Sequence, residues 1–327
     1  MSEFSIIDEF FKPLGLIGHR HSTDIGIGDD GAVISCPEGK KLVVVTDTLV
    51  EGVHFPLETS GYDIAWKALA VNLSDLAAMG AVPAFYTLCL SLPQRCADKS
   101  FLMDFVAGLK DLASKYGVPL VGGDTTKSDR LTLTVSAHGW VDDAKVLRRD
   151  AAQVGDKIYV SGNIGDGALA LQALLKKYDA ALLSGTVFDK FYRPEPRIKL
   201  GLALGGIANA AIDISDGFIA DLEHILLASN VSAEIDYAAM PFSDSMKQYL
   251  QATHDAWLPL TGGDDYELCF TLPESQVAGF ESVIEKEDFG VSVHSIGIIV
   301  PRTESGVVWK NAPNLDESIS TKGYEHF

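Results

Sequence analysis

The stretch that decides the fold class is residues 62–92, YDIAWKALAVNLSDLAAMGAVPAFYTLCLSL. Its first part places small and apolar residues at helical spacing up to residue 79, and Gly80 follows as a helix stop. Residues 84–92 then form a compact apolar run that is typical of a strand. A helix followed directly by a strand indicates a protein in which the two alternate.

The same alternation extends in both directions along the chain. Strands are predicted at 41–45, 131–141, 157–160, 211–214, 268–272 and 291–300, and helices at 99–116, after Gly167, at 198–208 and at 218–228. The chain has 327 residues, which at roughly 100–200 residues per domain favours two domains. A polar hinge around residue 150 predicts an N-terminal domain over 1–149 and a C-terminal domain over 150–327. We therefore expect a two-domain α/β (α+β) protein.

The charge of the chain excludes some classes of partner. The chain has 26 Lys and Arg against 45 Asp and Glu, a formal net charge of −19. Such a chain repels phosphate backbones and anionic lipid surfaces, so we expect neither a nucleic acid nor a membrane as partner. The hydrophobic fraction of 47% supplies a sizeable core and excludes disorder as the overall state.

The N-terminal residues and the cysteines indicate a cytoplasmic protein. Residues 1–11 contain acids and no basic region, so no signal peptide is expected, and no apolar run is long enough to span a bilayer. The four cysteines form no CxxC pair and no metal-binding spacing. Reduced thiols in the cytoplasm are the simplest interpretation.

Acidic residues recur beside glycine, serine or threonine at the ends of apolar segments, where α/β proteins build sites. Each acid by itself could be a turn residue or a helix cap. Together they indicate a site that binds a cation. The segments are GIGDDG (26–31), TDT (46–48), LSD (73–75), GGDTT (122–126), DISDG (213–217) and GGDDYE (262–267).

Two of these acids are hard to explain by structure alone. Asp75 falls in the last turns of its predicted helix, where the helix dipole disfavours an anion. Asp213 interrupts an apolar strand, and an unpaired buried carboxylate is costly. Carboxylates that converge repel one another by about 4 kcal/mol at ~4 Å and an effective dielectric near 20, so they need cations. Oxygen ligands of this kind suit Mg²⁺, which binds through a few carboxylates together with substrate phosphates.

With these segments the sequence resembles the thiamine-monophosphate kinase family, of the superfamily that includes aminoimidazole ribonucleotide synthetase and selenophosphate synthetase. The matching segments span nearly the whole chain in order. They are GIGDDGAV (26–33), TDTLVEGVHF (46–55), KALAVNLSDLAAMGA (67–81), GGDTT (122–126), AIDISDG (211–217), GGDDYELCF (262–270) and GYEHF (323–327).

The resemblance implies an enzyme, a Mg²⁺-dependent kinase that phosphorylates thiamine monophosphate with ATP as the last step of thiamine diphosphate biosynthesis. It implies a homodimer that pairs the N-terminal sheets, a C-terminal α/β domain and an active site in an interdomain cleft. The residues that it points to are Asp30, Thr46, Asp47, Asp75, Asp124, Asp213 and Asp216 as metal ligands, Gly123, Asp124, Arg149 and Ser215 at ATP, and His54, Asp264, Thr321 and Tyr324 at the substrate.

We assign no catalytic nucleophile or base, because the acceptor is a phosphate that is largely a dianion at pH 7. Direct in-line transfer, with several Mg²⁺ ions between the phosphates, is the mechanism that these residues allow. One alternative is another ATP-using synthetase of the superfamily; a selenophosphate synthetase would show a Cys and a Lys before Asp30, and here Lys12 lies far upstream. The other is a non-catalytic protein that binds divalent cations.

Overall fold

The structure, a computed structural model, describes residues 3–17 and 25–313 of the chain. These form two compact units. Of the described residues, the first unit comprises those up to Leu76 and residues 81–143, and the second comprises residues 77–80 and those from Ala144 onward. The domain boundary predicted between residues 149 and 150 lies a few residues beyond the division between Asp143 and Ala144.

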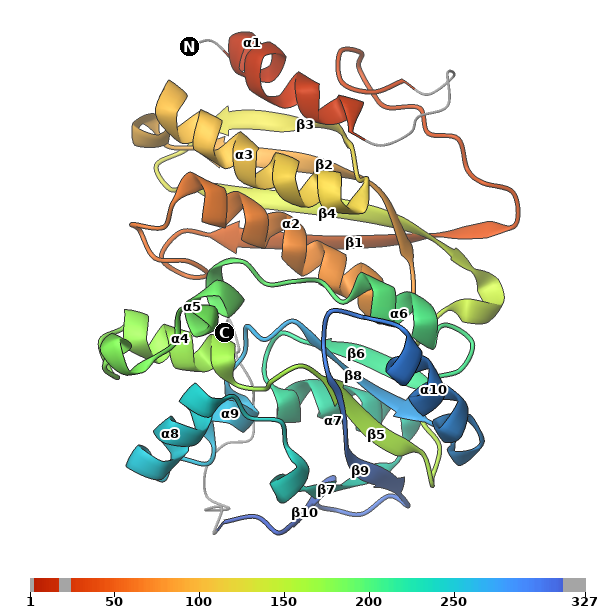
Figure 1. Cartoon of the computed structure of the whole chain (residues 1–327). Coiled ribbons are helices and arrows are strands. Elements are labelled where there is room, and N and C mark those ends of the chain that lie inside the picture. The colour runs from red at the N-terminus through yellow and green to blue at the C-terminus, as the bar shows by residue number, and fades with distance from the viewer. Residues whose placement is uncertain (1–2, 18–24, 314–327) are drawn as a thin grey trace. The chain divides into compact units, whose positions relative to one another are not determined.

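The first unit is built on a four-stranded mixed sheet with the order β1-β4-β2-β3, in which only β2 and β3 are parallel (Figure 1). The parallel pair is joined through a helix, as a crossover requires. The strands are β1 (Lys40–Val50), β2 (Val82–Leu92), β3 (Leu120–Lys127) and β4 (Thr132–Asp142).

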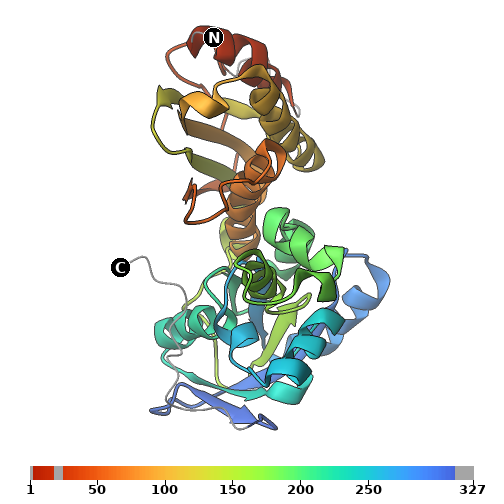
Figure 2. The same cartoon turned by 90° about the vertical axis from the view of Figure 1, so that its left-hand side faces the viewer.

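Two long helices, α2 (Gly61–Ala78) and α3 (Lys99–Tyr116), lie side by side on one face of this sheet (Figures 1 and 2). They approach closely at Gly108, where a Cβ atom would lie 2.2 Å from the carbonyl oxygen of Tyr62. Helix α3 has defined ends, since the Asp98 carboxylate accepts hydrogen bonds from two backbone N–H groups and Gly117 closes it with φ +66°. Because α2 and α3 cover only one face of the sheet, the side chains of β4 alternate strictly between buried and half-buried.

The N-terminal segment forms three short helical turns that lie against α3. Phe11 packs edge-on against Phe105 of α3, with ring centroids 6.5 Å apart. The turns are α1 (Glu3–Ile6), η1 (Ile7–Phe11) and η2 (Lys12–Leu16), and the other short turns of the chain are η3 (Gln94–Cys96), η4 (Asp143–Lys145), η5 (Ala180–Leu182) and η6 (Tyr237–Ala239).

The second unit is built on a six-stranded sheet with the order β10-β7-β9-β5-β8-β6, antiparallel except for the pair β10 and β7. Its strands are β5 (Lys157–Ser161), β6 (Ala210–Ile214), β7 (Ser232–Asp236), β8 (Glu267–Leu272), β9 (Val293–Val300) and β10 (Val307–Lys310). Its helices are α4 (Asp166–Leu174), α5 (Gly185–Tyr192), α6 (Ile198–Leu204), α7 (Phe218–Ser229), α8 (Asp244–Thr253), α9 (Leu258–Thr261) and α10 (Glu274–Lys286).

Both faces of this second sheet are covered. Helix α7 packs an apolar stripe against one face, where its Leu222 and Ile225 join Ile158 and Ile212 of the strands in one buried cluster. On the other face Phe280 of α10 packs edge-on against two stacked rings of the strands. Strands β5, β6 and β8 are consequently buried along almost their whole length.

The fold class predicted from the sequence, a two-domain α/β (α+β) protein, is confirmed. Helix α3 has the predicted bounds, α7 and β6 differ from prediction by one residue at one end, and α2 differs by one residue at each end. Among the described residues, no helix is both long and apolar enough to cross a membrane.

Two expectations about local structure are wrong. The acids of TDT (46–48) and GGDTT (122–126) were expected at strand ends but lie within β1 and β3. Strand β3 was missed because its two glycines and its polar residues conceal the period of a strand.

Candidate active site

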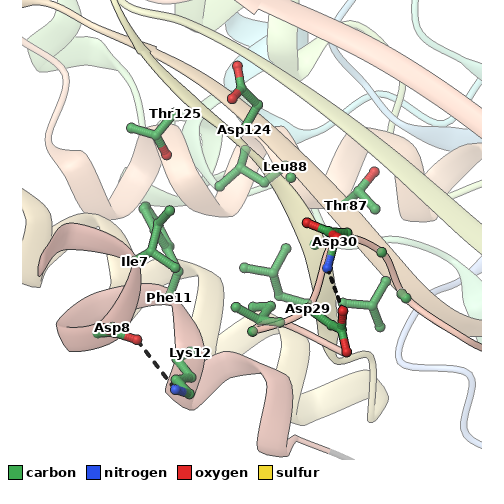
Figure 3. Close-up of a pocket in the computed structure, with 18 residues that line it drawn as sticks. Ile7, Asp8, Phe11, Lys12, Asp29, Asp30, Thr87, Leu88, Asp124 and Thr125 are labelled. Carbon is green, nitrogen blue, oxygen red and sulfur yellow. Dashed lines mark hydrogen bonds and ion pairs between the residues drawn. The ribbon is translucent and has the colours of Figure 1, made fainter. Parts of the chain in front are cut away.

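A pocket of about 710 Å³ lies in the first unit between the N-terminal turns, the loop 27–32, and strands β2 and β3 (Figure 3). Ile7 and Phe11 supply an apolar side, and Asp29, Asp30 and Asp124 supply an acidic side. The volume and the mixture of apolar wall and polar groups are typical of a small-molecule site.

The acidic side of the pocket contains two of the predicted metal ligands, Asp30 and Asp124, together with the predicted nucleotide residue Gly123. Both carboxylates belong to exposed residues. The backbone N–H of Asp30 donates to the Asp29 carboxylate at 2.8 Å, which fixes the local turn. The sequence prediction that these distant segments meet is therefore supported for Asp30, Gly123 and Asp124.

Gly123 is required by the geometry of the sheet. Its φ is +153°, and a Cβ atom there would lie 1.9 Å from the carbonyl oxygen of Leu88 on β2. Only glycine allows β3 to approach β2 this closely. Its neighbour Gly122 has open space at the corresponding position, so the two glycines of the GGDTT segment have different roles.

Lys12 also lines this pocket, opposite Asp29 and Asp30 (Figure 3). It pairs with Asp8 one helical turn before it, at 3.4 Å. In the sequence Lys12 lies too far upstream to be associated with Asp30, and only the folding of the N-terminal turns against α3 brings it there.

Thr46 and Asp47 are adjacent on β1, so their side chains point to opposite faces of the sheet. The Thr46 hydroxyl donates to Ser136 Oγ on β4 at 2.8 Å. Strands β1 and β3 are the two edges of the sheet. Three strand spacings of ~4.8 Å separate them, or about 14 Å, so within one chain Thr46 does not reach the pocket at Asp124.

His54 follows the end of β1 and is half-buried. Its Nδ1 accepts a hydrogen bond from the backbone N–H of Val50 at 2.9 Å. Its carbonyl oxygen accepts a hydrogen bond from Lys67 of α2 at 3.5 Å.

Asp75, further along α2, lies in the last turns of the helix as expected and is also half-buried.

In the second unit, three loops pack together at one end of strands β5, β6 and β8. They are residues 162–166 after β5, residues 215–217 after β6, and residues 262–266 before β8. The backbone N–H of Asp264 donates to the carbonyl oxygen of Ser215 at 2.9 Å. A Cβ atom on Gly263 would lie 2.2 Å from that same oxygen, so glycine is needed for this contact. Ser215, Asp216 and Asp264, expected to act together, are thus neighbours in the fold.

Asp221, in the first turn of α7, holds the loop at 215–217 and was missed by the sequence reasoning. One oxygen of its carboxylate accepts hydrogen bonds from the backbone N–H groups of Ser215, Asp216 and Gly217, at 2.9 to 3.2 Å. Burial, followed by the charges of Asp213 and Asp216, raises the pKa of Asp221 to about 8. The sequence signal that could have indicated this role is an acid in the first turn of a helix that directly follows a glycine, here Gly217.

The charges of Asp213 and Asp216 add to burial in raising the pKa of Asp221, and a cation bound between these acids would reduce their repulsion. Asp213 is only 3% exposed, and Asp216, three residues later, is half-buried. Such oxygen donors fit a hard divalent cation. No group of three or more His, Cys, Asp or Glu side chains within residues 3–17 and 25–313 is arranged to hold a metal ion by itself.

The remaining predicted residues lie outside these clusters. Arg149 is exposed in the segment before β5, and its carbonyl oxygen accepts a hydrogen bond from Ser229 Oγ at 3.0 Å. Thr321 and Tyr324 lie outside the described residues.

Comparison with known proteins defines the class. The family models named AIR synthase related protein, N-terminal domain, and AIR synthase related protein, C-terminal domain, match residues 28–141 and 153–310. The chain is therefore an AIR synthase related protein with both domains of that class.

Full-length relatives narrow the class. The chain is 41% identical to the thiamine-monophosphate kinase of Escherichia coli (strain K12) over 327 residues, which cover 99% of this chain and 98% of the relative. It resembles the crystal structure of thiamine-monophosphate kinase from Stenotrophomonas maltophilia K279a at a TM-score of 0.83 and 41% identity, covering 94% of this chain and 96% of that chain. It also resembles AaThiL complexed with AMPPCP and TMP at a TM-score of 0.75 and 31% identity, covering 99% and 97%. The chain belongs to the thiamine-monophosphate kinase family, which confirms the resemblance read from its motifs.

Proposed function

We propose that this chain transfers the γ-phosphoryl group of ATP to thiamine monophosphate, giving thiamine diphosphate and ADP. The observation that carries the proposal is the full-length similarity to thiamine-monophosphate kinases, among them AaThiL complexed with AMPPCP and TMP. The acidic pocket at Asp30 and Asp124 and the loop cluster at Ser215 and Asp264 support it, because both consist of residues from the matching motifs.

We propose that Gly123, Asp124, Arg149 and Ser215 contact the nucleotide. The backbone at Gly123 offers a surface without side chains, against which phosphates can lie closely. His54 and Asp264 would bind the thiamine phosphate. For Thr321 and Tyr324 the same role is proposed on sequence alone.

We propose that Mg²⁺ ions bind at Asp30, Thr46, Asp47, Asp75, Asp124, Asp213 and Asp216. The donor set fits, since it consists of oxygen atoms only, and Mg²⁺ takes its remaining ligands from water and substrate phosphates. When bound, these ions neutralise the phosphates of two anionic substrates and stabilise the charge of the transferred group.

The residues of the chain position the substrates rather than exchange protons with them. The acceptor is a phosphate monoester that is largely a dianion at pH 7 and needs no general base. His54 Nδ1 already accepts a backbone hydrogen bond, so the group left to bind the thiamine phosphate is the other ring nitrogen, Nε2, as a donor. The transfer is direct, and no residue becomes phosphorylated.

We further propose that the protein is a homodimer joined through the open face of the first sheet. On this face three adjacent strands present an apolar group that includes Leu42, Val44 and Val82, which are 47%, 56% and 49% exposed. Phe85 and His138 stack beside them with ring centroids 4.5 Å apart. An exposed apolar patch of this kind marks an interface. A second copy would also offer its own Thr46 to a pocket that Thr46 of the same chain does not reach.

The use of ATP, together with four free thiols in the described chain, is consistent with the cytoplasmic location that we expect.

The test is an assay of ADP release from ATP with thiamine monophosphate as the acceptor. Turnover is expected to depend strictly on thiamine monophosphate and Mg²⁺, with no ADP from substrates of aminoimidazole ribonucleotide synthetase. ATP consumption without thiamine monophosphate contradicts the proposal, and so does a phospho-protein trapped after a single turnover with labelled ATP.

The dimer is tested by analytical ultracentrifugation of Val44→Asp against the unchanged chain. The added charge on the apolar face should dissociate the dimer.

A further inference from the structure

A buried ion cluster in the second unit contains none of the residues that are proposed to bind the substrates or Mg²⁺. Glu267, the first residue of β8, is fully buried. One oxygen of its carboxylate pairs with Arg197 Nη2 at 2.5 Å and with Lys190, and the other accepts from Arg197 Nε at 2.7 Å and Ser161 Oγ at 2.6 Å. Burial alone would raise the pKa of Glu267, but Lys190 and Arg197 outweigh it and hold the pKa below its usual value.

The backbone around the cluster is shaped to receive this carboxylate. Gly162 has φ +60°, and a Cβ atom there would lie 2.1 Å from Glu267 Oε1. Ser161 Oγ also accepts the backbone N–H of Leu268 at 2.9 Å, so the serine connects β5 to the start of β8. The carboxylate of Glu267 is thus fixed between Ser161 and Gly162 on one side and Arg197 on the other.

The residues directly before Glu267 are in strained conformations. Asp264 has φ +70° and Tyr266 has φ +50°, in the left-handed region that side chains other than glycine rarely adopt. A residue in such a conformation is strained and persists only where its surroundings determine it. The Tyr266 hydroxyl donates to Asp264 Oδ1 at 3.1 Å, so the backbone at Tyr266 also sets the direction of the Asp264 carboxylate.

We infer that Arg197, through its bidentate pair with Glu267, is a positioning residue that fixes the strained segment 264–266 and thereby aims Asp264 at the thiamine phosphate. This inference rests on the proposed function, because it takes Asp264 as a substrate residue. Arg197 lies at the start of α6, 70 residues before Glu267, and only the fold joins them.

The double variant Arg197→Met with Glu267→Met tests the inference without leaving a buried charge. Replacing both members of a buried ion pair by apolar residues is often neutral for stability, whereas removing one is not. In this variant Ser161 Oγ still accepts the backbone N–H of Leu268. The Lys190 side chain is 22% exposed, so water can solvate its charge. The expected result is a melting temperature close to that of the unchanged protein, with KM for thiamine monophosphate raised about tenfold and KM for ATP nearly unchanged. Calorimetric titration with thiamine monophosphate should show the same loss of affinity without any turnover.

The matched control is Asn209→Ala, which weakens a second polar cluster at the other end of the same strands. There the Asn209 amide donates to Asp156 at 2.9 and 3.0 Å, and Thr271 of β8 donates to Asp156 at 3.1 Å. This variant should lower the melting temperature and leave both KM values unchanged. An equal rise in KM for thiamine monophosphate in the control overturns the inference, and so does an unchanged KM in the double variant.

Asp264→Asn separates the inference from the function on which it rests. If Asp264→Asn weakens binding of thiamine monophosphate and the double variant does not, the inference alone fails. If Asp264→Asn leaves binding unchanged, the substrate role of Asp264 and the inference fail together, while turnover of thiamine monophosphate continues. If the unchanged protein does not turn over thiamine monophosphate, the proposed function itself fails.

Discussion

The two acidic clusters of this protein are held in opposite ways. In the pocket of the first unit, Asp29, Asp30 and Asp124 belong to exposed residues on a loop and an edge strand. In the second unit, Asp265 and Glu267, at the start of β8, are 2% and 0% exposed. Asp265 accepts hydrogen bonds from the backbone N–H groups of Gly165 and Gly167, and Glu267 pairs with the Arg197 side chain. Exposed carboxylates are solvated and can adjust around a ligand, whereas buried ones must be satisfied by the fold itself. The first cluster should therefore tolerate substitution structurally, and the second should not.

The largest expected effect is the loss of stability in Glu267→Ala. The change leaves the Arg197 guanidinium, which is 8% exposed, without its bidentate partner, and breaking a buried pair in this way costs about 3–5 kcal/mol. The matched change in the first unit is Asp142→Ala, which removes a partly exposed pair with Lys40 at 2.6 Å and should cost less than about 1 kcal/mol. Urea unfolding monitored by circular dichroism measures both. Equal costs would remove the contrast between the units.

Next in size is the loss of activity in Asp124→Ala. Removing a group that stabilises phosphates through a bound cation should lower kcat/KM about 100-fold or more, which corresponds to ~2.7 kcal/mol. Because Asp124 is exposed, its removal should leave the melting temperature unchanged or slightly higher. A variant with nearly normal turnover at saturating Mg²⁺ would show that the pocket is not the nucleotide site.

A smaller effect is expected at the glycines of β3. Gly123→Ala places a Cβ atom against the carbonyl of Leu88 and should cost of order 1–3 kcal/mol, with weaker binding of an ATP analogue. Gly122→Ala meets open space and serves as the control, with stability and binding both retained. Thermal unfolding and calorimetric titration distinguish the two. A Gly123→Ala protein as stable as the control would contradict the close approach of β3 to β2.

The last prediction concerns the pH dependence of stability at Asp265. Burial raises the pKa of Asp265 well above its usual value, although the N–H groups of Gly165 and Gly167 act against the rise. A carboxyl with a raised pKa in the folded state favours folding when it is protonated, and that contribution is lost as the pH rises above about 4 through the folded pKa. Asp265→Asn should therefore gain stability relative to the unchanged protein as the pH increases from 4 to 8. A difference in unfolding free energy that stays constant across this range would show that Asp265 titrates normally.

The local elements could be predicted because their signals are local. The helical period and Gly117 fix α3, and the apolar run broken by Asp213 marks β6 correctly as a buried strand. Strand β3 was missed because its sequence is dominated by glycine, threonine and acid, and its strand conformation depends on pairing with β2. For the same reason the pocket residue Lys12 could not be associated with Asp30, since nothing in the sequence shows that the N-terminal turns lie against α3.

The sequence by itself determined the two-domain α/β class, the family, and the acidic segments that we propose as the site, because motif order and periodicity are properties of the chain alone. The tertiary structure decided which of those acids meet. It brought Asp30 to Asp124 and Ser215 to Asp264, and it placed Thr46 on the far edge of the sheet. It also supplied the groups that hold the sites in place, such as Asp221 and Arg197, because a buried charge is recognised only when its partner, far away in sequence, is known.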